Sequence, residues 1–355
     1  MQSPTICLVA ELPPPAGGMA IQAAWLSRLL VESGHTVINV PTNPLPLDSA
    51  WRGYPLLRGV VNFYRFCCIL HRACAQTDIT HVFSNSYLSF FLFTAPAVMC
   101  AKWLRKPLVL HYHGGAAKAF LNRWGYFARP FILSARTVIV PSLFLRDTFA
   151  RHGVDAVEIP NVLATGLPFR RRATLQPHLI MTRHLEPVYN IACGLRAFRL
   201  VLDNYPNASL VIAGGGRERE SLERLSENLG LGKHVKFVGP VSNEQVFSLY
   251  DQADIFLNSS NVDNQPVSIL EAFACGLPIV STAAGGIPFL VRDSEDALLA
   301  RVGDPADLAR QILRLLSEPA LAASLIENGL VRSHAFSGAV VYRQLNAVYK
   351  EAMVK

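Results

Sequence analysis

Residues 258–278 read NSSNVDNQPVSILEAFACGLP, and they follow a short apolar run that predicts a buried strand at residues 255–258. Pro266 is typical of the first turn of a helix, where its missing N–H group costs nothing, and Gly276 followed by Pro278 is typical of a helix end. Such a helix starts at the carboxyl edge of a parallel sheet, where free N–H groups and the helix dipole favour a phosphate. The segment therefore predicts an α/β fold with an anion site at one edge of a sheet.

Two carboxylates flank this helix start. Glu271 falls about 7 to 8 Å beyond it at the usual helical rise, so its two oxygens can accept hydrogen bonds from a ribose diol. Asp263 precedes the helix by several residues. We expect it on the loop, on the opposite side of the phosphates and nearer to an attached sugar. The residues on the loop and the first turn that we expect to bind the phosphate-bearing ligand are Asn264, Gln265, Pro266, Val267 and Ser268.

The rest of the chain alternates short apolar runs with helical stretches, which indicates parallel sheets covered on both faces. Strands are predicted at residues 6–10, 35–40, 79–83, 107–112 and 137–140, and then at 179–181, 209–213, 235–238, 255–258 and 278–281. At 355 residues the chain exceeds one ordinary domain. We predict two doubly wound domains, residues 1–168 and 177–336, with a polar hinge at 169–176 and a final helix, 337–355, that crosses back to the first domain.

Composition excludes a disordered chain, because 51% of the residues are hydrophobic and 17% are charged. The seven cysteines are an odd number without paired Cys-x-x-Cys spacing, so we expect neither a disulfide framework nor a zinc site. We also expect a cytoplasmic protein, because the first residues lack the pattern of a signal peptide. Residues 79–101 carry no charge, but polar residues and Pro96 interrupt them, so a strand and a buried helix are expected there instead of a membrane span. A helix that dips into a membrane surface is the alternative.

The net charge of +7 comes entirely from the first half of the chain. Residues 1–165 contain 14 Lys and Arg against 7 Asp and Glu, whereas residues 166–355 contain 19 of each kind. We therefore expect the first domain to meet an anionic partner, either a phosphate-bearing acceptor or the acidic inner face of a membrane. A solvated basic face with no partner is the alternative. Nucleic acid is not expected, because the chain has no recognition motif for it.

The segment from Asp263 to Pro278, followed by Gly-Gly-Ile-Pro at 285–288, resembles the retaining glycosyltransferases of the GT-B fold, family 4, also called group 1. Further matching motifs occur in the family's order over nearly the whole chain: Gly17-Gly18, His113-Gly114-Gly115, Ile159-Pro160-Asn161, Gly214-Gly215-Gly216 and Tyr250-Asp251-Gln252-Ala253-Asp254. The resemblance implies two Rossmann-like domains facing across a cleft.

The resemblance also implies roles for individual residues. Glu271 would bind the ribose and Asp263 the sugar hydroxyls, while His113 would lie beside the transferred sugar and Arg183 would neutralise the leaving diphosphate. His113, Asp263 and Arg183 are thus the expected catalytic residues. Glycine backbone would approach the donor phosphates, and the donor-binding residues expected outside the helix start are Gly17, Gly18, Arg183, Gly214, Gly215, Arg217 and Gly286.

The sequence departs from the family pattern at two positions. A lysine that normally accompanies the arginine is missing, because Tyr189 or Asn190 stands at its place. Arg217, just after the glycine turn, is a candidate substitute, and a surface role for it is equally compatible with the sequence. Phe289 replaces a family glutamate.

We interpret the chain as a retaining glycosyltransferase, of hexosyltransferase type, that moves a sugar from a nucleotide-diphospho-sugar to a lipid-linked or glycan acceptor. The resemblance implies that neither a cofactor nor a metal is needed, because the helix start and Arg183 would stabilise the diphosphate. A nucleotide-sugar epimerase of the same fold and a non-catalytic nucleotide-sugar binder remain alternatives. A dehydrogenase is disfavoured, because Gly214-Gly215-Gly216 lacks the third glycine of the dinucleotide fingerprint, with Arg219 in its place.

Overall fold

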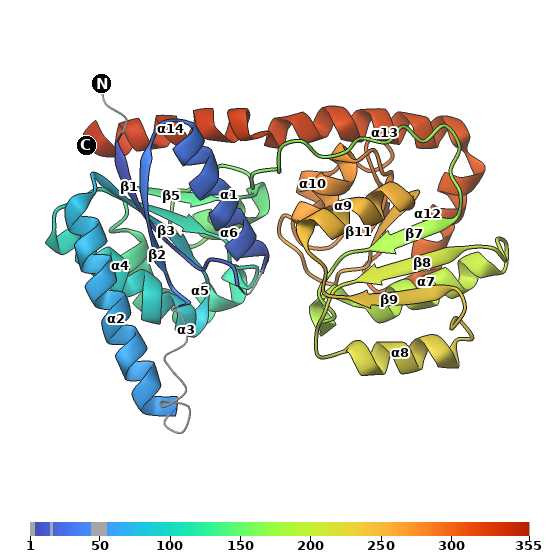
Figure 1. Ribbon diagram of the computed structural model, residues 1–355, viewed down its shortest axis with the longest axis horizontal. Coiled ribbons are helices and arrows are strands. Elements are labelled where there is room, and N and C mark those ends of the chain that lie inside the picture. Colours follow the sequence, from blue (N-terminus) through green and yellow to red (C-terminus); the bar gives the residue numbers. More distant parts are fainter. Residues whose placement is uncertain (1–3, 15–16, 44–54, 355) are drawn as a thin grey trace. The chain divides into compact units, whose positions relative to one another are not determined.

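The computed structural model describes residues 4–14, 17–43 and 55–354 (Figure 1). The chain forms two compact units, Met1–Val162 together with Gly338–Lys355, and Leu163–Ser337. Each unit contains a six-stranded sheet in which all paired strands are parallel and alternate with helices along the chain. The predicted pair of doubly wound α/β domains is therefore confirmed.

The first unit has the strand order β2-β1-β3-β4-β5-β6. Its elements are β1 (Thr5–Ala10), α1 (Gly18–Glu32), β2 (Thr36–Pro41), α2 (Pro55–Gln76), β3 (Ile79–Ser84), α3 (Tyr87–Ser89), the π-helical η2 (Phe90–Thr94), α4 (Ala95–Trp103), β4 (Leu108–Tyr112), α5 (Ala117–Ile132), β5 (Thr137–Val140), α6 (Leu143–Ala150), β6 (Val157–Glu158) and, from the end of the chain, α14 (Gly338–Val354).

The second unit has the strand order β12-β11-β10-β7-β8-β9. Its elements are β7 (His178–Met181), the 3₁₀ turn η3 (Pro187–Tyr189), α7 (Ile191–Leu202), β8 (Ser209–Ala213), α8 (Arg219–Asn228), β9 (Val235–Gly239), α9 (Asn243–Gln252), β10 (Ile255–Asn258), α10 (Val267–Ala274), β11 (Ile279–Thr282), α11 (Ile287–Leu290), β12 (Leu298–Ala300), α12 (Pro305–Ser317), α13 (Pro319–Ser333) and the 3₁₀ turn η4 (His334–Phe336).

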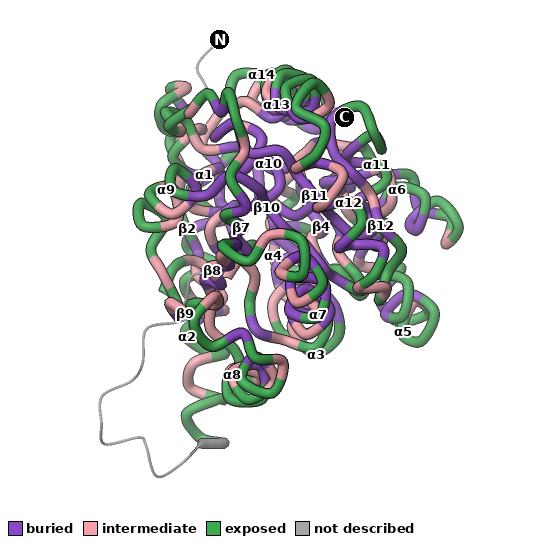
Figure 2. Tube along the Cα trace, turned by 90° about the vertical axis from the view of Figure 1, so that its right-hand side faces the viewer, coloured by how far each residue is buried: buried purple, intermediate pink, exposed green. Residues whose placement is uncertain are grey.

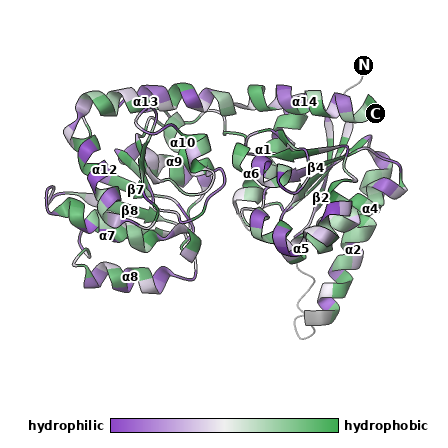
Figure 3. Cartoon of the chain, turned by 180° about the vertical axis from the view of Figure 1, so that it is seen from behind, coloured by the Kyte–Doolittle hydropathy of each residue, from purple (hydrophilic) through white to green (hydrophobic). Residues whose placement is uncertain are grey.

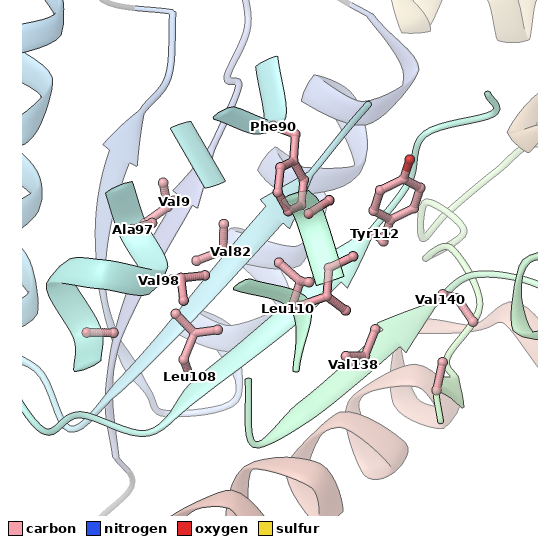
Figure 4. Packing of buried hydrophobic residues seen from close by; sticks show 14 of the residues in the cluster. Val9, Val82, Phe90, Ala97, Val98, Leu108, Leu110, Tyr112, Val138 and Val140 are labelled. Atoms are coloured by element: carbon pink, nitrogen blue, oxygen red, sulfur yellow. The ribbon is translucent and has the colours of Figure 1, made fainter. Parts of the chain in front are cut away.

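Alternate residues of the first sheet enter two different cores. Val82 and Leu110 belong to the core under α2, α4 and α5 (Figure 4), whereas Leu8 and Val109 belong to the core under α1 and α14. Figure 2 shows the strands buried behind helices whose outer sides are exposed. Strands buried on both faces explain why their sequences are continuous apolar runs without a polar alternation.

Two strands were not predicted from the sequence. They are β6, with two residues, and β12, with three, and each lies at an edge of its sheet. Runs this short contain too few residues to show a periodic pattern. Whether they form a strand depends on the neighbouring strand of the folded sheet with which they pair.

The hinge predicted at residues 169–176 lies inside the second unit, because Arg172 is buried there. Its guanidinium donates to the carbonyl oxygens of Ala253 at 3.0 Å, Cys275 at 2.8 Å and Tyr250 at 2.7 Å. These carbonyls lie at the carboxyl ends of α9 and α10, where unpaired acceptors and the helix dipole favour a cation. The boundary between the units falls earlier, between Val162 and Leu163.

The uncharged stretch at residues 79–101 forms β3 and then the continuous helical run of α3, η2 and α4. The strand is buried as predicted, but the helical run is only partly so, because Leu88 and Met99 are exposed. Across the part of the chain that the structure describes, no helix is both long and apolar enough to cross a bilayer.

We expect Arg172→Ala to lower the free energy of unfolding of the second unit by about 2 to 4 kcal/mol, because the truncation leaves several buried carbonyl groups without a donor. Urea unfolding followed by circular dichroism measures the change. Arg171→Ala is the matched control, since the Arg171 side chain is exposed, and it should change stability by less than about 0.5 kcal/mol. Equal losses for both variants would contradict the buried role of Arg172.

Candidate active site

The two loops that carry the predicted charges meet where the order of the second sheet reverses. The chain passes from β7 outward to β8 and β9, and then crosses to β10 on the other side of β7. The carboxyl ends of β7 and β10 therefore lie at the point in the strand order where open α/β sheets usually bind ligands. Arg183 follows β7 and Asp263 follows β10, and Arg183 Nη2 donates to Asp263 Oδ2 at 2.6 Å.

The Arg183 guanidinium is held on three sides. Besides Asp263 it contacts the ring of Tyr189, whose centroid lies 4.2 Å from its Cζ, and its Nη1 lies 3.5 Å from the hydroxyl of Ser268. The side chains of Arg183 and Asp263 are only 14% and 9% exposed, so water screens this pair little. Nε of Arg183 has no partner among the described residues. A guanidinium fixed in this way retains donor capacity for an incoming anion.

The place of the missing family lysine is filled without a second cation. Tyr189 packs its ring against the Arg183 guanidinium, which is a cation–π contact and not a charge of its own. Asn190 has a left-handed backbone (φ 45°) and its side chain accepts a hydrogen bond from Cys193 N at 3.3 Å, which caps α7. Arg217, the suggested substitute, pairs with Glu186 at 2.8 Å and is 74% exposed, so the surface role describes it in this structure.

Glu271 and Asp263 both interact with Arg183, the first through its charge and the second through direct contact. Glu271 is the fifth residue of α10, and the hydroxyl of the buried Tyr250 lies 3.4 Å from its Oε2. The same hydroxyl lies 2.8 Å from Thr182 Oγ1. Burial raises the pKa of Glu271 to about 7, although the Tyr250 hydrogen bond and the Arg183 charge oppose the rise. Sequence reasoning missed Tyr250 as a site residue, because a fully buried tyrosine has the signature of a core residue.

Helix α10 starts at Val267, so Pro266 occupies the position before the first helical residue and not the first turn as predicted. No described side chain caps this helix start, and no acidic residue lies in its first turn. Ser268 in that turn faces Arg183, while Asn264 and Gln265 are buried in the preceding loop. The uncapped N–H groups and the guanidinium together make a site for an anion.

The predicted glycines of the second unit allow neighbouring turns to pack closely on the two charged loops and on Pro240. A Cβ at Gly214 would overlap the carbonyl of Arg183, and one at Gly215 would lie 2.8 Å from Pro240. A Cβ at Gly286 would overlap the carbonyl of Asn264, and the Gly286 N–H donates to the Asp263 carbonyl at 2.7 Å. The Gly286 amide expected near a pyrophosphate is therefore engaged within the protein, because its turn packs on the Asp263 loop.

Gly17 and Gly18 differ from these glycines. They stand at the start of α1, and an added Cβ on either would meet no described atom within 4 Å. Packing within the described surroundings therefore gives no reason for two glycines at this place. Open backbone at a helix start is what close approach of a ligand requires.

His113 follows β4 in the first unit and is neutral. Its ring stacks on Phe83 with 4.6 Å between centroids, and its Nε2 is buried without a partner among the described residues. Burial lowers its pKa to about 3, so the imidazole is uncharged at physiological pH. A neutral imidazole can donate or accept one hydrogen bond with a hydroxyl.

A row of side chains behind His113 was not foreseen. His111 lies 4.2 Å from the His113 ring, and its Nδ1 lies 3.3 Å from His81 Nε2. Nδ1 of His81 lies 2.6 Å from the hydroxyl of Tyr349 in α14. Alternate positions on two adjacent strands bring the histidines together, and the tyrosine comes from 268 residues away, so no local pattern predicts this contact.

Comparisons with known proteins agree with this architecture. The profile described as "Glycosyl transferases group 1" matches residues 170–332, and that of "Glycosyltransferase Family 4" matches residues 16–167. The chain is 25% identical to phosphatidyl-myo-inositol mannosyltransferase of Mycolicibacterium smegmatis, over 94% of this chain and 90% of that protein. It is 28% identical to an exopolysaccharide phosphotransferase of Streptomyces coelicolor over 78% of this chain, but spans only 29% of that relative's length.

Among solved structures, the fold is similar to that of the Anabaena protein HepE in complex with UDP-glucose. The TM-score is 0.75 at 16% identity, and the match covers 98% of this chain and 99% of the other. At this identity the likeness shows the fold alone, and the two-domain architecture of the GT-B type is thereby confirmed.

The raised pKa of Glu271 predicts a dependence of stability on pH. Unfolding returns the carboxyl to its ordinary pKa, so the folded state binds more protons between that value and about 7, and Glu271 lowers stability as the pH rises through this window. Relative to Glu271→Gln, which cannot ionise, we expect the wild type to lose roughly 1 to 3 kcal/mol between pH 5 and pH 8. Unfolding midpoints of both proteins across this range measure the difference. Parallel curves would contradict a desolvated Glu271.

Proposed function

The chain belongs to the group 1 and family 4 glycosyltransferases, and from this membership we propose that it transfers a sugar, with retention at the anomeric carbon, from a nucleotide-diphospho-sugar to a lipid-linked or glycan acceptor. The observation that supports the donor class best is the position of Arg183. Its guanidinium lies between Asp263 and Ser268, at the uncapped start of α10. A diphosphate needs this combination of a cation and free backbone N–H groups.

In the proposed reaction the bond between the sugar and the diphosphate breaks, and negative charge grows on the leaving diphosphate. Arg183 and the first turn of α10 are already oriented toward that charge, so little reorganisation is needed when it develops. Tyr189 keeps the guanidinium in place from its aromatic face. In this proposal, one side-chain cation and one helix start therefore stabilise the charge on the leaving diphosphate.

The two carboxylates have separate roles in this proposal. Glu271 accepts hydrogen bonds from the ribose hydroxyls in its ionised form, which the nearby Arg183 charge favours. Asp263 accepts hydrogen bonds from hydroxyls of the donor sugar while it orients Arg183. In the first unit, the neutral His113 offers its unpartnered Nε2 to a hydroxyl of the transferred sugar.

We propose that the reaction needs no metal ion. The positive charge that a divalent cation would place on the diphosphate is supplied by Arg183 and by the α10 dipole. Retained activity after treatment with a chelator is the expected result, and a full loss that returns with Mg²⁺ or Mn²⁺ would contradict it.

Related proteins support the choice of donor and acceptor. The Anabaena protein HepE of the same fold binds UDP-glucose, and the mycobacterial relative is by name a mannosyltransferase acting on phosphatidyl-myo-inositol. We infer a lipid-linked or glycan acceptor of this general kind, bound by the more basic first unit at the inner face of a membrane.

Site variants test the donor assignment. We expect Arg183→Ala to lower kcat by about 100-fold to 1000-fold while weakening donor binding less, because its largest contribution comes when charge develops. Glu271→Ala should weaken nucleotide binding by about tenfold through the lost ribose contacts. Arg217→Ala is the matched control and should change either quantity by less than about twofold, since its ion pair is exposed.

A thermal-shift screen of nucleotide-diphospho-sugars selects the donor, because a ligand that binds only the folded protein raises the melting temperature. Radiolabel from that donor is then followed into a lipid extract and into free sugar. Transfer to the extract that depends on Arg183 supports the proposal. A donor converted to its epimer without transfer, or bound without turnover under every condition, would overturn it.

A further inference from the structure

Three helices of the first unit form a layer with an unusual outer face. α2, α4 and α5 cover one side of the sheet, α2 packs on α4, and α4 packs on α5. Their inner sides contribute Phe66, Val98 and Phe120 to the core. Figure 3 shows apolar residues continuing along these helices, although each has only one side against the sheet. The outer sides are called here the α2–α4–α5 face.

The α2–α4–α5 face carries positive charge without compensation. The three helices contain no Asp or Glu, and their seven basic residues are all exposed: Arg58, Arg65, Arg72, Lys102, Lys118, Arg123 and Arg129. Within the described ranges, none of the seven forms an ion pair. Nothing on these helices therefore offsets their attraction for an anionic surface.

Helices of the second unit show that this pattern is not general for the chain. On α8, Arg219 pairs with Glu223 four residues later. On α12, Arg310 pairs with Asp307, and Arg314 pairs with Glu318 just beyond the helix. The arginines of these surface helices are matched by acids one turn away, as is usual for a solvated helix. The absence of such acids on the α2–α4–α5 face therefore sets it apart.

Large apolar side chains lie exposed among these cations. Trp103 on α4 is 75% exposed, Tyr64 on α2 is 70% exposed, and Tyr126 on α5 is 88% exposed. Further exposed apolar residues of the three helices are Leu57, Val60, Phe63, Ile69, Met99, Trp124 and Phe127. An accumulation of this size is uncommon on a surface that meets only water. Trp and Tyr together with Lys and Arg are the residues that proteins place at the level of lipid headgroups.

We propose that the α2–α4–α5 face docks on the surface of a bilayer that contains anionic lipids. The cations attract the lipid phosphates, and the exposed aromatic and aliphatic side chains enter the headgroup region, where their apolar surface leaves water. Charge complementarity selects the anionic surface, and the aliphatic members Leu57, Val60 and Met99 favour lipid over nucleic acid, which offers them no apolar layer. The proposal extends the membrane-bound acceptor of the proposed function, but docking is measured without any transfer.

Sedimentation of the full chain with vesicles tests the proposal. Vesicles of phosphatidylcholine alone are compared with vesicles that also contain phosphatidylglycerol, at low and at raised salt. We expect binding to the anionic vesicles only, weakening as salt rises. The double variant Arg65→Glu with Arg123→Glu should lower the partition coefficient by at least about tenfold. The double variant Trp103→Ala with Tyr126→Ala should lower the partition coefficient by a similar factor, and this loss should be the same at low and at raised salt.

The matched control reverses two exposed charges of the second unit, Arg196→Glu with Lys233→Glu, which changes the net charge equally. Vesicle binding by this control variant should stay within about twofold of that of the wild type. All substituted residues are exposed, so unchanged melting temperatures identify correctly folded variants. An equal loss in this control would overturn the proposal, because net charge alone would then explain the binding. So would vesicle binding that is insensitive to the aromatic substitutions and competed away by duplex RNA.

The outcome is separable from the proposed function. Binding of a nucleotide-diphospho-sugar, followed by thermal shift, should be the same in the face variants and in the wild type. A wild type that binds the donor but no anionic vesicle removes the docking face and leaves the transferase proposal in place. A wild type that binds vesicles but no nucleotide-sugar removes the transferase proposal and supports the docking face.

Discussion

An ion pair between Arg183 and Asp263 joins the loops that leave β7 and β10, and the candidate active site depends on it. Both side chains are largely buried, so either one alone would be an uncompensated charge in a poorly screened place. The pair persists because the backbone of each loop is held independently. The turn of Gly286 packs on the Asp263 loop, and the turn of Gly214 packs on the backbone of Arg183. Glycines that look like ligand contacts in the sequence thus serve first to let neighbouring turns pack on each of the two charged loops.

The aromatic ring of Tyr189 contacts the Arg183 guanidinium at the place where the sequence comparison with the family leads us to expect a second cation. A lysine beside Arg183 would repel it in the absence of an anion, whereas the face of an aromatic ring attracts a guanidinium and restricts its motion. The shortage of nearby positive charge also affects the pKa of Glu271. With one cation nearby instead of two, its desolvation is less fully offset, and its pKa stays near neutrality.

The two units differ in how their positively charged side chains are paired with acids. In the second unit, several surface arginines are matched by acids on the same helix or just beyond it, and Arg172 is buried against helix ends. In the first unit, α2, α4 and α5 expose cations with no acidic neighbour on the same helices, next to bulky apolar side chains. The basic composition of the sequence is therefore the sum of a balanced half and an unbalanced one. The unbalanced half contains the basic α2–α4–α5 face, whereas the candidate anion site of the balanced half depends on Arg183 and a helix start.

The sequence alone determined the parallel α/β architecture, because alternating apolar runs and helix signals are local, and it determined that residues 258–278 form a loop and a helix that follow a strand. It also located Arg183, Asp263 and Glu271. Only the tertiary structure decided which groups touch. Tyr250 contacts Glu271 from another helix, and Tyr349 contacts His81 across 268 residues of sequence. Arg172, in the segment predicted as a hinge, is buried and donates to the Tyr250 carbonyl. Local patterns report what a segment can form, whereas contacts between distant side chains depend on how strands are ordered in the sheet, which no single segment encodes.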